Sequence, residues 1–227
     1  MAVLLVVTNW DHIADTGIKT GWYLPEVAHP YYVLKEHGVP MTICSPKGGF
    51  APMDPSSGEA FKDDPECKRL LADDDVQKQL KNTVAAKDVD PSKFKAIVFT
   101  GGHGPMFDFP DSVELNKAAA DIYEAGGIAA AVCHGTAGLV NTKLKDGTYL
   151  VKGHKVTSFT NSEEISIKLM DPMPFALETR LKEHGADFVD GGDWQKNVQV
   201  SGRVITGQNP ASATGLGEAI AKKLKEL

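Results

Sequence analysis

A cysteine and a histidine stand side by side in the run 131–135, which reads Ala-Val-Cys-His-Gly. A thiolate is a strong nucleophile, and an imidazole exchanges a proton near neutral pH, so Cys133 and His134 are candidates for nucleophile and general base. The small flanking residues Ala131 and Gly135 allow a sharp turn, as in the Gly-x-Ser-x-Gly elbow. A helix beginning there should lower the pKa of the thiol. The alternatives are an inert, buried cysteine and a partly buried histidine bonded to backbone.

A second candidate is the run 101–104, Gly-Gly-His-Gly. Glycine lets a carbonyl substrate approach the backbone, and N–H groups near Gly102 and His134 can stabilise a developing oxyanion. Gly102 and His103 are therefore candidates for oxyanion or substrate binding, with a simple strand-to-helix turn as the alternative. Four large side chains are further candidates for a pocket lining, although each is equally compatible with core or surface packing: Trp10, His12, Trp22 and Trp194.

The elements that must position these runs alternate between strands and helices. Apolar patterning predicts strands over residues 3–8, 41–44, 94–100, 128–132, 149–151 and 155–158, and a hairpin-like pair over 198–200 and 204–206. Helices are expected over 26–36, 112–124, 136–140, 175–183 and 211–224, with a bend or late start at Pro30. This alternation predicts an α/β fold with a mostly parallel, doubly wound sheet and helices on both faces. Both chemical runs follow strands, where such sheets bind ligands.

Residues 50–92 are rich in Pro, Asp, Ser and Lys, with short helices expected around 67–71 and 76–80. They have too few large apolar side chains to bury a core of their own. We therefore expect a small inserted cap region beside the core of a single domain that spans residues 1–227.

Composition excludes several classes of function. A net charge of −6 argues against a nucleic-acid partner, which needs clustered Lys and Arg. The apolar segment 3–7 is too short for a membrane span and lacks the basic start of a signal peptide. Cys44, Cys67 and Cys133 form no Cys-x-x-Cys pair, so neither a disulfide framework nor a structural zinc site is expected. A cytoplasmic protein without a metal is the resulting prediction.

Four runs together resemble one family: Ala-Val-Cys-His-Gly at 131–135, Gly-Gly-His-Gly-Pro-Met-Phe-Asp at 101–108, Ser-Pro-Lys-Gly-Gly at 45–49 and Thr-Gly-Gln-Asn-Pro-Ala-Ser at 206–212. They occur in the order seen in the ThiJ/PfpI superfamily, and the chain is most similar to its heat-shock chaperone and glyoxalase III branch. The resemblance extends over essentially the whole chain, including the insertion. It implies a flavodoxin-like sheet with the cysteine at its elbow.

The resemblance also implies two acids at the site. Glu26 matches the family's acid that hydrogen-bonds the cysteine sulfur, and beside a thiolate it should be protonated. From its own surroundings in the sequence, Glu26 would be an exposed helix residue. Glu164 matches an acid that completes a Cys-His-acid arrangement and orients His134, with Glu163 as a rival. The alternative for this pair is a solvated helix start capped by Asn161 or Ser162.

The activity implied by the resemblance is that of a glutathione-independent glyoxalase, a D-lactate dehydratase. It converts methylglyoxal or a similar small dicarbonyl and water to lactate without a cofactor. Cys133 would form a hemithioacetal, and His134 would move a proton through an enediol. Alternatives are a cysteine peptidase or amidase with a Cys133-His134-Glu164 triad, and a stress-responsive holding chaperone or protein deglycase. The resemblance further implies a homodimer.

Overall fold

Continuous apolar runs form the inner strands of a seven-stranded sheet in the computed structural model, which describes residues 2–227. The strands follow the order β3-β2-β1-β4-β5-β9-β8, and every neighbouring pair is parallel except β8 with β9. Their bounds are β1 (Ala2–Val6), β2 (Met41–Ser45), β3 (Val84–Ala85), β4 (Phe94–Phe99), β5 (Ile128–Val132), β8 (Val198–Ser201) and β9 (Val204–Gly207). The predicted α/β class with a mostly parallel sheet is confirmed.

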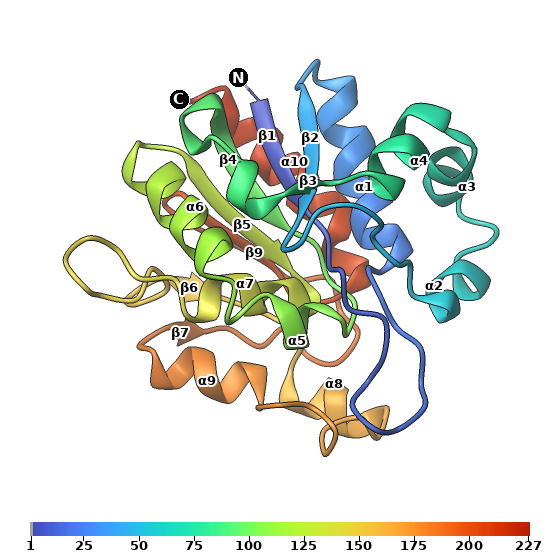
Figure 1. The fold of residues 1–227 in the computed structure, drawn as a ribbon. Coiled ribbons are helices and arrows are strands. Elements are labelled where there is room, and N and C mark those ends of the chain that lie inside the picture. Colours follow the sequence, from blue (N-terminus) through green and yellow to red (C-terminus); the bar gives the residue numbers. More distant parts are fainter. Residues whose placement is uncertain (1) are drawn as a thin grey trace.

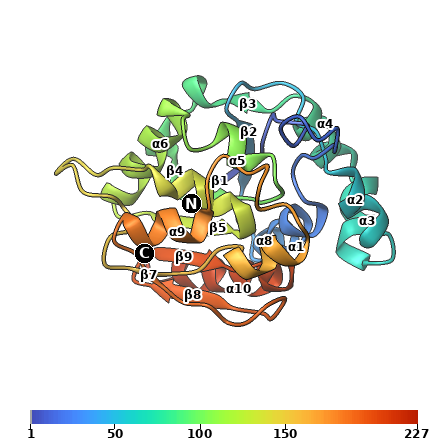
Figure 2. The ribbon, with the colours of Figure 1, turned by 90° about the horizontal axis from the view of Figure 1, so that it is seen from below.

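Helices cover both faces of the sheet, as Figure 1 and, from below, Figure 2 show. One layer contains α1 (Leu24–Glu36), α3 (Pro65–Ala72), α4 (Asp74–Lys81) and α10 (Ala213–Leu224). The other contains α5 (Pro105–Asp108), α6 (Val113–Glu124), α7 (Ala137–Val140) and α9 (Leu177–Glu183). Within residues 2–227, no helix combines the length and apolar character that crossing a bilayer requires.

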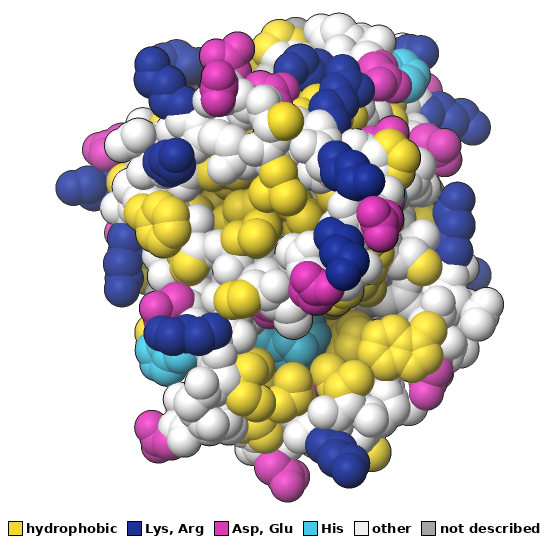
Figure 3. All heavy atoms as spheres, turned by 90° about the vertical axis from the view of Figure 1, so that its right-hand side faces the viewer, with side chains coloured by type: hydrophobic (Ala, Val, Ile, Leu, Met, Phe, Trp, Pro, Cys, Tyr) yellow, Lys and Arg dark blue, Asp and Glu magenta, His cyan; other side chains and the backbone are white. Residues whose placement is uncertain are grey.

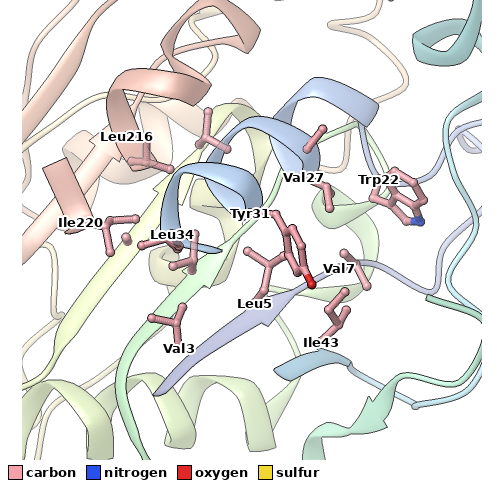
Figure 4. Packing of buried hydrophobic residues seen from close by; sticks show 14 of the residues in the cluster. Val3, Leu5, Val7, Trp22, Val27, Tyr31, Leu34, Ile43, Leu216 and Ile220 are labelled. Atoms are coloured by element: carbon pink, nitrogen blue, oxygen red, sulfur yellow. The ribbon is translucent and has the colours of Figure 1, made fainter. Parts of the chain in front are cut away.

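Strand β1 is apolar throughout because its two faces pack against different helix layers. Val3 and Leu5 belong to the cluster formed with α1 and α10, whereas Leu4 and Val6 belong to the cluster formed with α6 and α7. Figure 4 shows the first of these clusters, with β1 beneath side chains of α1 and α10. All four side chains are fully buried. Each stabilises the fold by about 1.5–3 kcal/mol relative to an exposed side chain, which anchors the strands that end at the site.

Helix α1 differs from the sequence-based prediction at two residues, Pro25 and Pro30. It begins at Leu24, earlier than expected, with Pro25 in the first turn, where a proline lacks only an N–H that needs no partner. It then continues through Pro30. Helix α10 supports that point, because a Cβ on Gly217 would lie 2.9 Å from the Pro30 Cα. Packing against α10 thus holds α1 helical beyond a residue that interrupts its hydrogen bonds, and the expected late start is wrong.

The insertion is more closely integrated than the sequence suggested. It contains α2 (Pro55–Ala60), α3 and α4, and then β3, which extends the main sheet by pairing with β2. Side chains from α3 and α4, including Cys67 and Leu70, are buried in the same cluster as β1. The expectation of a region beside the core is therefore corrected, since these residues form part of the core.

In the C-terminal third of the chain, the predicted hairpin of β8 and β9 is confirmed, and one predicted strand is wrong. Residues 149–151, predicted as a strand, form a turn in which Tyr149 makes only an isolated bridge to Lys143. A separate parallel pair is formed by β6 (Lys155–Val156) and β7 (Asp187–Phe188). The remaining elements are α8 (Asn161–Ser166) and four short 3₁₀ helices: η1 (Ala86–Asp88), η2 (Pro91–Lys93), η3 (Cys133–Thr136) and η4 (Pro210–Ser212).

Candidate active site

Cys133 lies at the carboxyl end of β5, where the chain turns into η3. Its φ of +58° is in the left-handed region that side chains other than glycine rarely adopt. The turn is tight, because a Cβ on Gly135 would lie 2.4 Å from the Phe99 carbonyl oxygen. The sulfur therefore faces the end of the sheet from a strained position, a kind of backbone strain that concentrates at functional sites.

Beside the sulfur, His134 is part of a hydrogen-bonded series of side chains. Its Nδ1 lies 3.4 Å from the Cys133 Sγ, and its Nε2 lies 2.5 Å from Oε2 of Glu164 on α8. The other carboxylate oxygen, Oε1, lies 2.9 Å from Nε2 of His103. Glu164 is therefore shared by two histidines. The structure brings together four residues singled out in the sequence, although the contact between His103 and Glu164 was not foreseen.

The protonation of this series follows from its surroundings. Burial acts to raise the pKa of Glu164, but the two histidines lower it well below its ordinary value. Burial and the neighbouring His103 lower the pKa of His134. Because the pKa of Glu164 and the pKa of His134 are both lowered, the carboxyl group is ionised and the imidazole beside it is neutral. The carboxylate then accepts the Nε2 proton of His134, which assigns the tautomer and leaves the Nδ1 lone pair facing the sulfur.

Glu26 approaches the same sulfur from α1 and is completely buried, contrary to the exposed position that its local sequence suggested. Gly101 makes this possible, since a Cβ there would lie 2.3 Å from Oε2 of Glu26 and 2.9 Å from the Cys133 Cβ. Neither carboxyl oxygen has a hydrogen bond of normal geometry within residues 2–227. Burial raises the pKa of Glu26 to about 8, although the nearby Cys133 thiol and Gly101 N–H oppose the rise. Glu26 is therefore mostly protonated at neutral pH.

The pKa of the Cys133 thiol moves in the direction opposite to the prediction. Burial raises it well above its ordinary value, a charged Glu26 raises it further, and the His134 backbone N–H opposes this more weakly. The following helices, η3 and α7, have only four residues each and supply little of the dipole on which the prediction rested. Protonation of Glu26 removes its repulsion and provides a hydrogen-bond donor to the sulfur instead.

The N-terminal cap of α8 gives Glu163 and Glu164 different hydrogen-bond partners. The N-cap is Thr160, neither Asn161 nor Ser162, and it forms a capping box with Glu163. Glu163 also accepts hydrogen bonds from the Trp194 backbone N–H and the Asn209 side chain, each at 2.8 Å. Both carboxylates are buried, so the alternative of a solvated helix start is wrong. Glu164 alone of the two bonds to His134.

A cavity of about 270 Å³ opens above the sulfur, and the predicted Gly102 and His103 line it. Gly102 has a φ of +99°, and a Cβ there would lie 2.1 Å from the Gly21 carbonyl oxygen. Of the large side chains proposed as lining, Trp194 does so, whereas Trp10, His12 and Trp22 do not. The lining that the sequence did not reveal comes from loops far apart in the chain: Ile13, Ile18, Lys19, Tyr23, Asp54, Ser56, Phe159, Ile167, Leu169 and Pro210.

The other two cysteines lie away from this cavity. Cys44 and Cys67 are buried, and burial raises the pKa of each thiol. His103, His134 and Glu164 bring three possible metal ligands within 4.8 Å of one another, as do His29, Asp64 and Cys67 between α1 and α3. Two imidazoles and a carboxylate suit a divalent transition metal. At the active site, hydrogen bonds among the same atoms already account for their arrangement. That the reaction uses no metal stays a prediction.

Comparisons with known proteins find one family and several relatives similar over most of the chain. The model of the DJ-1/PfpI family matches residues 18–223. Glyoxalase 3 of Candida albicans is 32% identical over 96% of each chain. The glutathione-independent glyoxalase HSP31 of Saccharomyces cerevisiae is 32% identical over 93% of this chain and 92% of its own.

Solved structures resemble the chain over nearly its full length. Glyoxalase III from Candida albicans superposes with a TM-score of 0.91 at 30% identity, covering 98% of this chain and 96% of its own. The Rapid Encystment Protein of 24 kDa from Francisella tularensis superposes with a TM-score of 0.94 at 38% identity, covering 99% of both chains.

Proposed function

Because the chain belongs to the DJ-1/PfpI family, we propose that it is a glutathione-independent glyoxalase, a D-lactate dehydratase of the glyoxalase III type. The reaction takes methylglyoxal and water to lactate and needs no metal or organic cofactor. The similarity to glyoxalase 3 of Candida albicans supports this activity. So does a small cavity whose floor carries a thiol, a carboxyl group and an imidazole.

In the first step the Cys133 sulfur adds to the aldehyde carbon. The carbon–sulfur bond forms, the π electrons of the carbonyl group move to oxygen, and the thiol proton reaches that oxygen to complete a hemithioacetal. Glu26, buried beside the sulfur and mostly protonated at neutral pH, is placed to relay this proton. Backbone N–H groups near Gly102 and His134 stabilise the charge that develops on oxygen.

In the second step His134 moves a proton between adjacent carbons. Its free Nδ1 takes the proton from the carbon bonded to sulfur and delivers it to the ketone oxygen, which gives an enediol. The hydroxyl proton on the carbon bonded to sulfur then passes through the imidazole to the neighbouring carbon, so that this C–OH group becomes the thioester carbonyl group. One carbon is oxidised and the other reduced, so no external oxidant is needed, and the product is a thioester. Water hydrolyses the thioester, which releases lactate and restores the Cys133 thiol.

The observation that carries the proposal is the orientation of His134. Glu164 binds Nε2, which leaves Nδ1 unprotonated, and Nδ1 lies 3.4 Å from the sulfur. A substrate carbon bonded to that sulfur would therefore lie beside Nδ1. This proximity suits transfer of a proton from the carbon next to sulfur. His103 binds the second oxygen of Glu164 and thereby holds the carboxylate in place.

The decisive measurement is loss of methylglyoxal without glutathione, with lactate measured in parallel. We expect Cys133→Ala to abolish turnover and Cys44→Ala, which removes a buried thiol that does not line the cavity, to retain it. A metal chelator should leave the wild-type rate unchanged. Turnover by the Cys133→Ala protein at the wild-type rate would refute the proposed mechanism.

A cysteine peptidase or amidase is the second candidate, because Cys133, His134 and Glu164 form the hydrogen-bonded series that such enzymes use. A peptide chain needs an open groove, whereas the sulfur lies at the floor of a pocket and Cys133 is only 4% exposed. A panel of peptides, amides and small dicarbonyls separates the two activities.

A holding chaperone or protein deglycase is a third candidate, favoured by apolar side chains that remain exposed near the pocket, including Ile18 and Trp194. Chaperone activity should survive Cys133→Ala, whereas deglycase activity should not. The cytoplasmic location and the homodimer stay predictions. Sedimentation measurements on the purified protein test the second of these.

A further inference from the structure

Strained backbone is concentrated around the cavity. Within residues 2–227, four residues other than glycine have a positive φ: Ala14, Cys133, Lys168 and Trp194. Cys133 is at the floor, and the other three lie on separate loops that border the same cavity. Each of these loops contributes an apolar side chain to the wall: Ile13 and Ile18, Ile167 and Leu169, and Trp194 itself. Such strain persists only where surrounding contacts hold it, and it concentrates in ligand-binding segments.

Trp194 shows what holds one of these loops. Its φ is +62°, and its backbone N–H donates to the buried Glu163 at 2.8 Å. The indole packs edge-on against Phe159 with ring centroids 5.6 Å apart, and Phe159 in turn lies 4.5 Å from the ring of His134. Trp194 is nevertheless 47% exposed. An aromatic ring is thus fixed in contact with solvent, on a continuous path of rings that leads to the base.

The mouth of the cavity combines three such exposed apolar side chains. Ile18 is 45% exposed, Ile167 is 37% exposed, and Trp194 completes the set, which we call the apolar mouth. Figure 3 shows hydrophobic side chains around a hollow with histidine at its floor. Polar reacting groups at the floor and apolar groups at the mouth suit a ligand with a polar head and an apolar tail.

The cavity is also larger than methylglyoxal requires. At about 270 Å³, its volume is close to the lower end of the range of about 300–1,000 Å³ found for pockets that bury drug-sized ligands. Methylglyoxal contains only three carbons and two oxygens. With its aldehyde carbon at the Cys133 sulfur, it would leave the upper part of the cavity empty and the apolar mouth without contact.

We propose that the apolar mouth binds the side group of 2-oxoaldehydes bulkier than methylglyoxal, with aromatic side groups preferred. This specificity rests on the proposed glyoxalase function and names its substrate class. The aldehyde end reaches Cys133, while the side group packs between Ile18, Ile167 and the indole of Trp194. The chemistry at the two carbonyl carbons is the same for every such substrate, and water again supplies the hydroxyl group of the product acid.

The test compares kcat/KM for phenylglyoxal and methylglyoxal. Trp194→Asn removes the indole with a residue that tolerates a positive φ, which separates loss of the ring from loss of the backbone conformation. We expect it to lower kcat/KM for phenylglyoxal about tenfold and for methylglyoxal less than about twofold, mainly through KM. Trp194→Phe should retain most of the preference. Val113→Ala is the control, since Val113 is 72% exposed and outside the cavity.

The outcomes separate this inference from the function on which it rests. If the wild-type protein turns over neither aldehyde, the proposed glyoxalase function is wrong. If it turns over both and Trp194→Asn leaves their ratio unchanged, the specificity is wrong and the function stands. Equal losses for both substrates also contradict it, because they indicate damage to the floor. Suppression of client-protein aggregation that depends on Trp194, without any effect on the substrate ratio, would assign the apolar mouth to a chaperone surface instead.

Discussion

Two buried carboxyl groups lie on opposite sides of the Cys133 site and are held in opposite protonation states. Glu26, on the α1 side, has no hydrogen bond of normal geometry within residues 2–227, and burial raises its pKa to about 8. Glu164, on the α8 side, is bonded by two histidines, which lower its pKa despite burial. Burial alone therefore does not set the charge of an acid. The donors around it decide. In the proposed mechanism, one acid carries a proton and the other stays a fixed anion.

The largest effect should follow from Glu164→Gln. Glutamine has one carbonyl oxygen where glutamate has two, so its amide N–H₂ group must face either His103 or His134. Facing His134, it favours the tautomer with a protonated Nδ1, which is unable to act as the base. We expect kcat for methylglyoxal to fall by about 10³- to 10⁴-fold, as when a triad acid becomes an amide.

Steady-state kinetics measure this loss, and circular dichroism checks that the fold is kept. Glu183→Gln on α9 is the matched control, because that carboxylate is 61% exposed and outside the cavity. A decrease in kcat smaller than threefold would mean that Glu164 does not set the tautomer of His134.

A smaller loss is expected for Glu26→Gln, which keeps the size and a donor but removes the titrating proton. We expect kcat to fall about 10²-fold, within the usual range for a proton-transfer group. In the wild type, activity should decline as pH rises through about 8, because Glu26 then loses its proton and repels the developing thiolate. The variant should lose this alkaline decline.

The measurement is the pH profile of kcat from pH 5 to pH 10 for both proteins. An unchanged alkaline decline in Glu26→Gln would assign that ionisation to another group. Glu26→Asp, which restores a carboxyl group at a greater distance from the sulfur, should recover the decline together with part of the rate.

The site residues also differ in how far the sequence alone predicts their positions. Cys133 and His134 follow from position alone, because residues after buried parallel strands meet at one edge of the sheet. Glu26 required the family resemblance, since nothing local indicates that α10 and the insertion bury its helix. The choice between Glu163 and Glu164 depends on which side of α8 faces the histidines, and consecutive helix residues diverge by about 100°.

Other sequence-based predictions also fail because contacts between distant parts of the chain decide the structure. Strand β3 has two residues and is a strand only because β2 lies beside it. Conversely, residues 149–151 have the composition of a strand but no neighbouring strand with which to pair. The positive φ values of Lys168 and Trp194 carry no sequence signal, because neither position is occupied by glycine. Strain of this kind is held by partners such as Glu163, which are distant in the sequence.

The last prediction concerns stability, where Glu26 should make the folded state less stable as pH rises. Its pKa is about 8 in the folded protein and 4.5 at its ordinary value, so the folded state holds the proton more tightly. Its contribution is fully present below pH 4.5 and is lost as pH rises toward 8. We expect the free energy of unfolding of the wild type, relative to Glu26→Gln, to fall by about 1.4 kcal/mol per pH unit in that window. Glu164, with its lowered pKa, acts in the opposite direction and only below pH 4.5.

Urea unfolding of both proteins at several pH values between 5 and 9 measures this difference. Taking the difference removes the contribution of Asp108, whose buried carboxyl group has a pKa raised to about 7 and is present in both proteins. The difference should level off above pH 8, where Glu26 is ionised in both the folded and the unfolded states. Glu36→Gln, an exposed position on the same helix, should show no such slope. A difference that is flat from pH 5 to pH 9 would mean that Glu26 is ionised in the folded protein, and the contrast between the two acids would then fail.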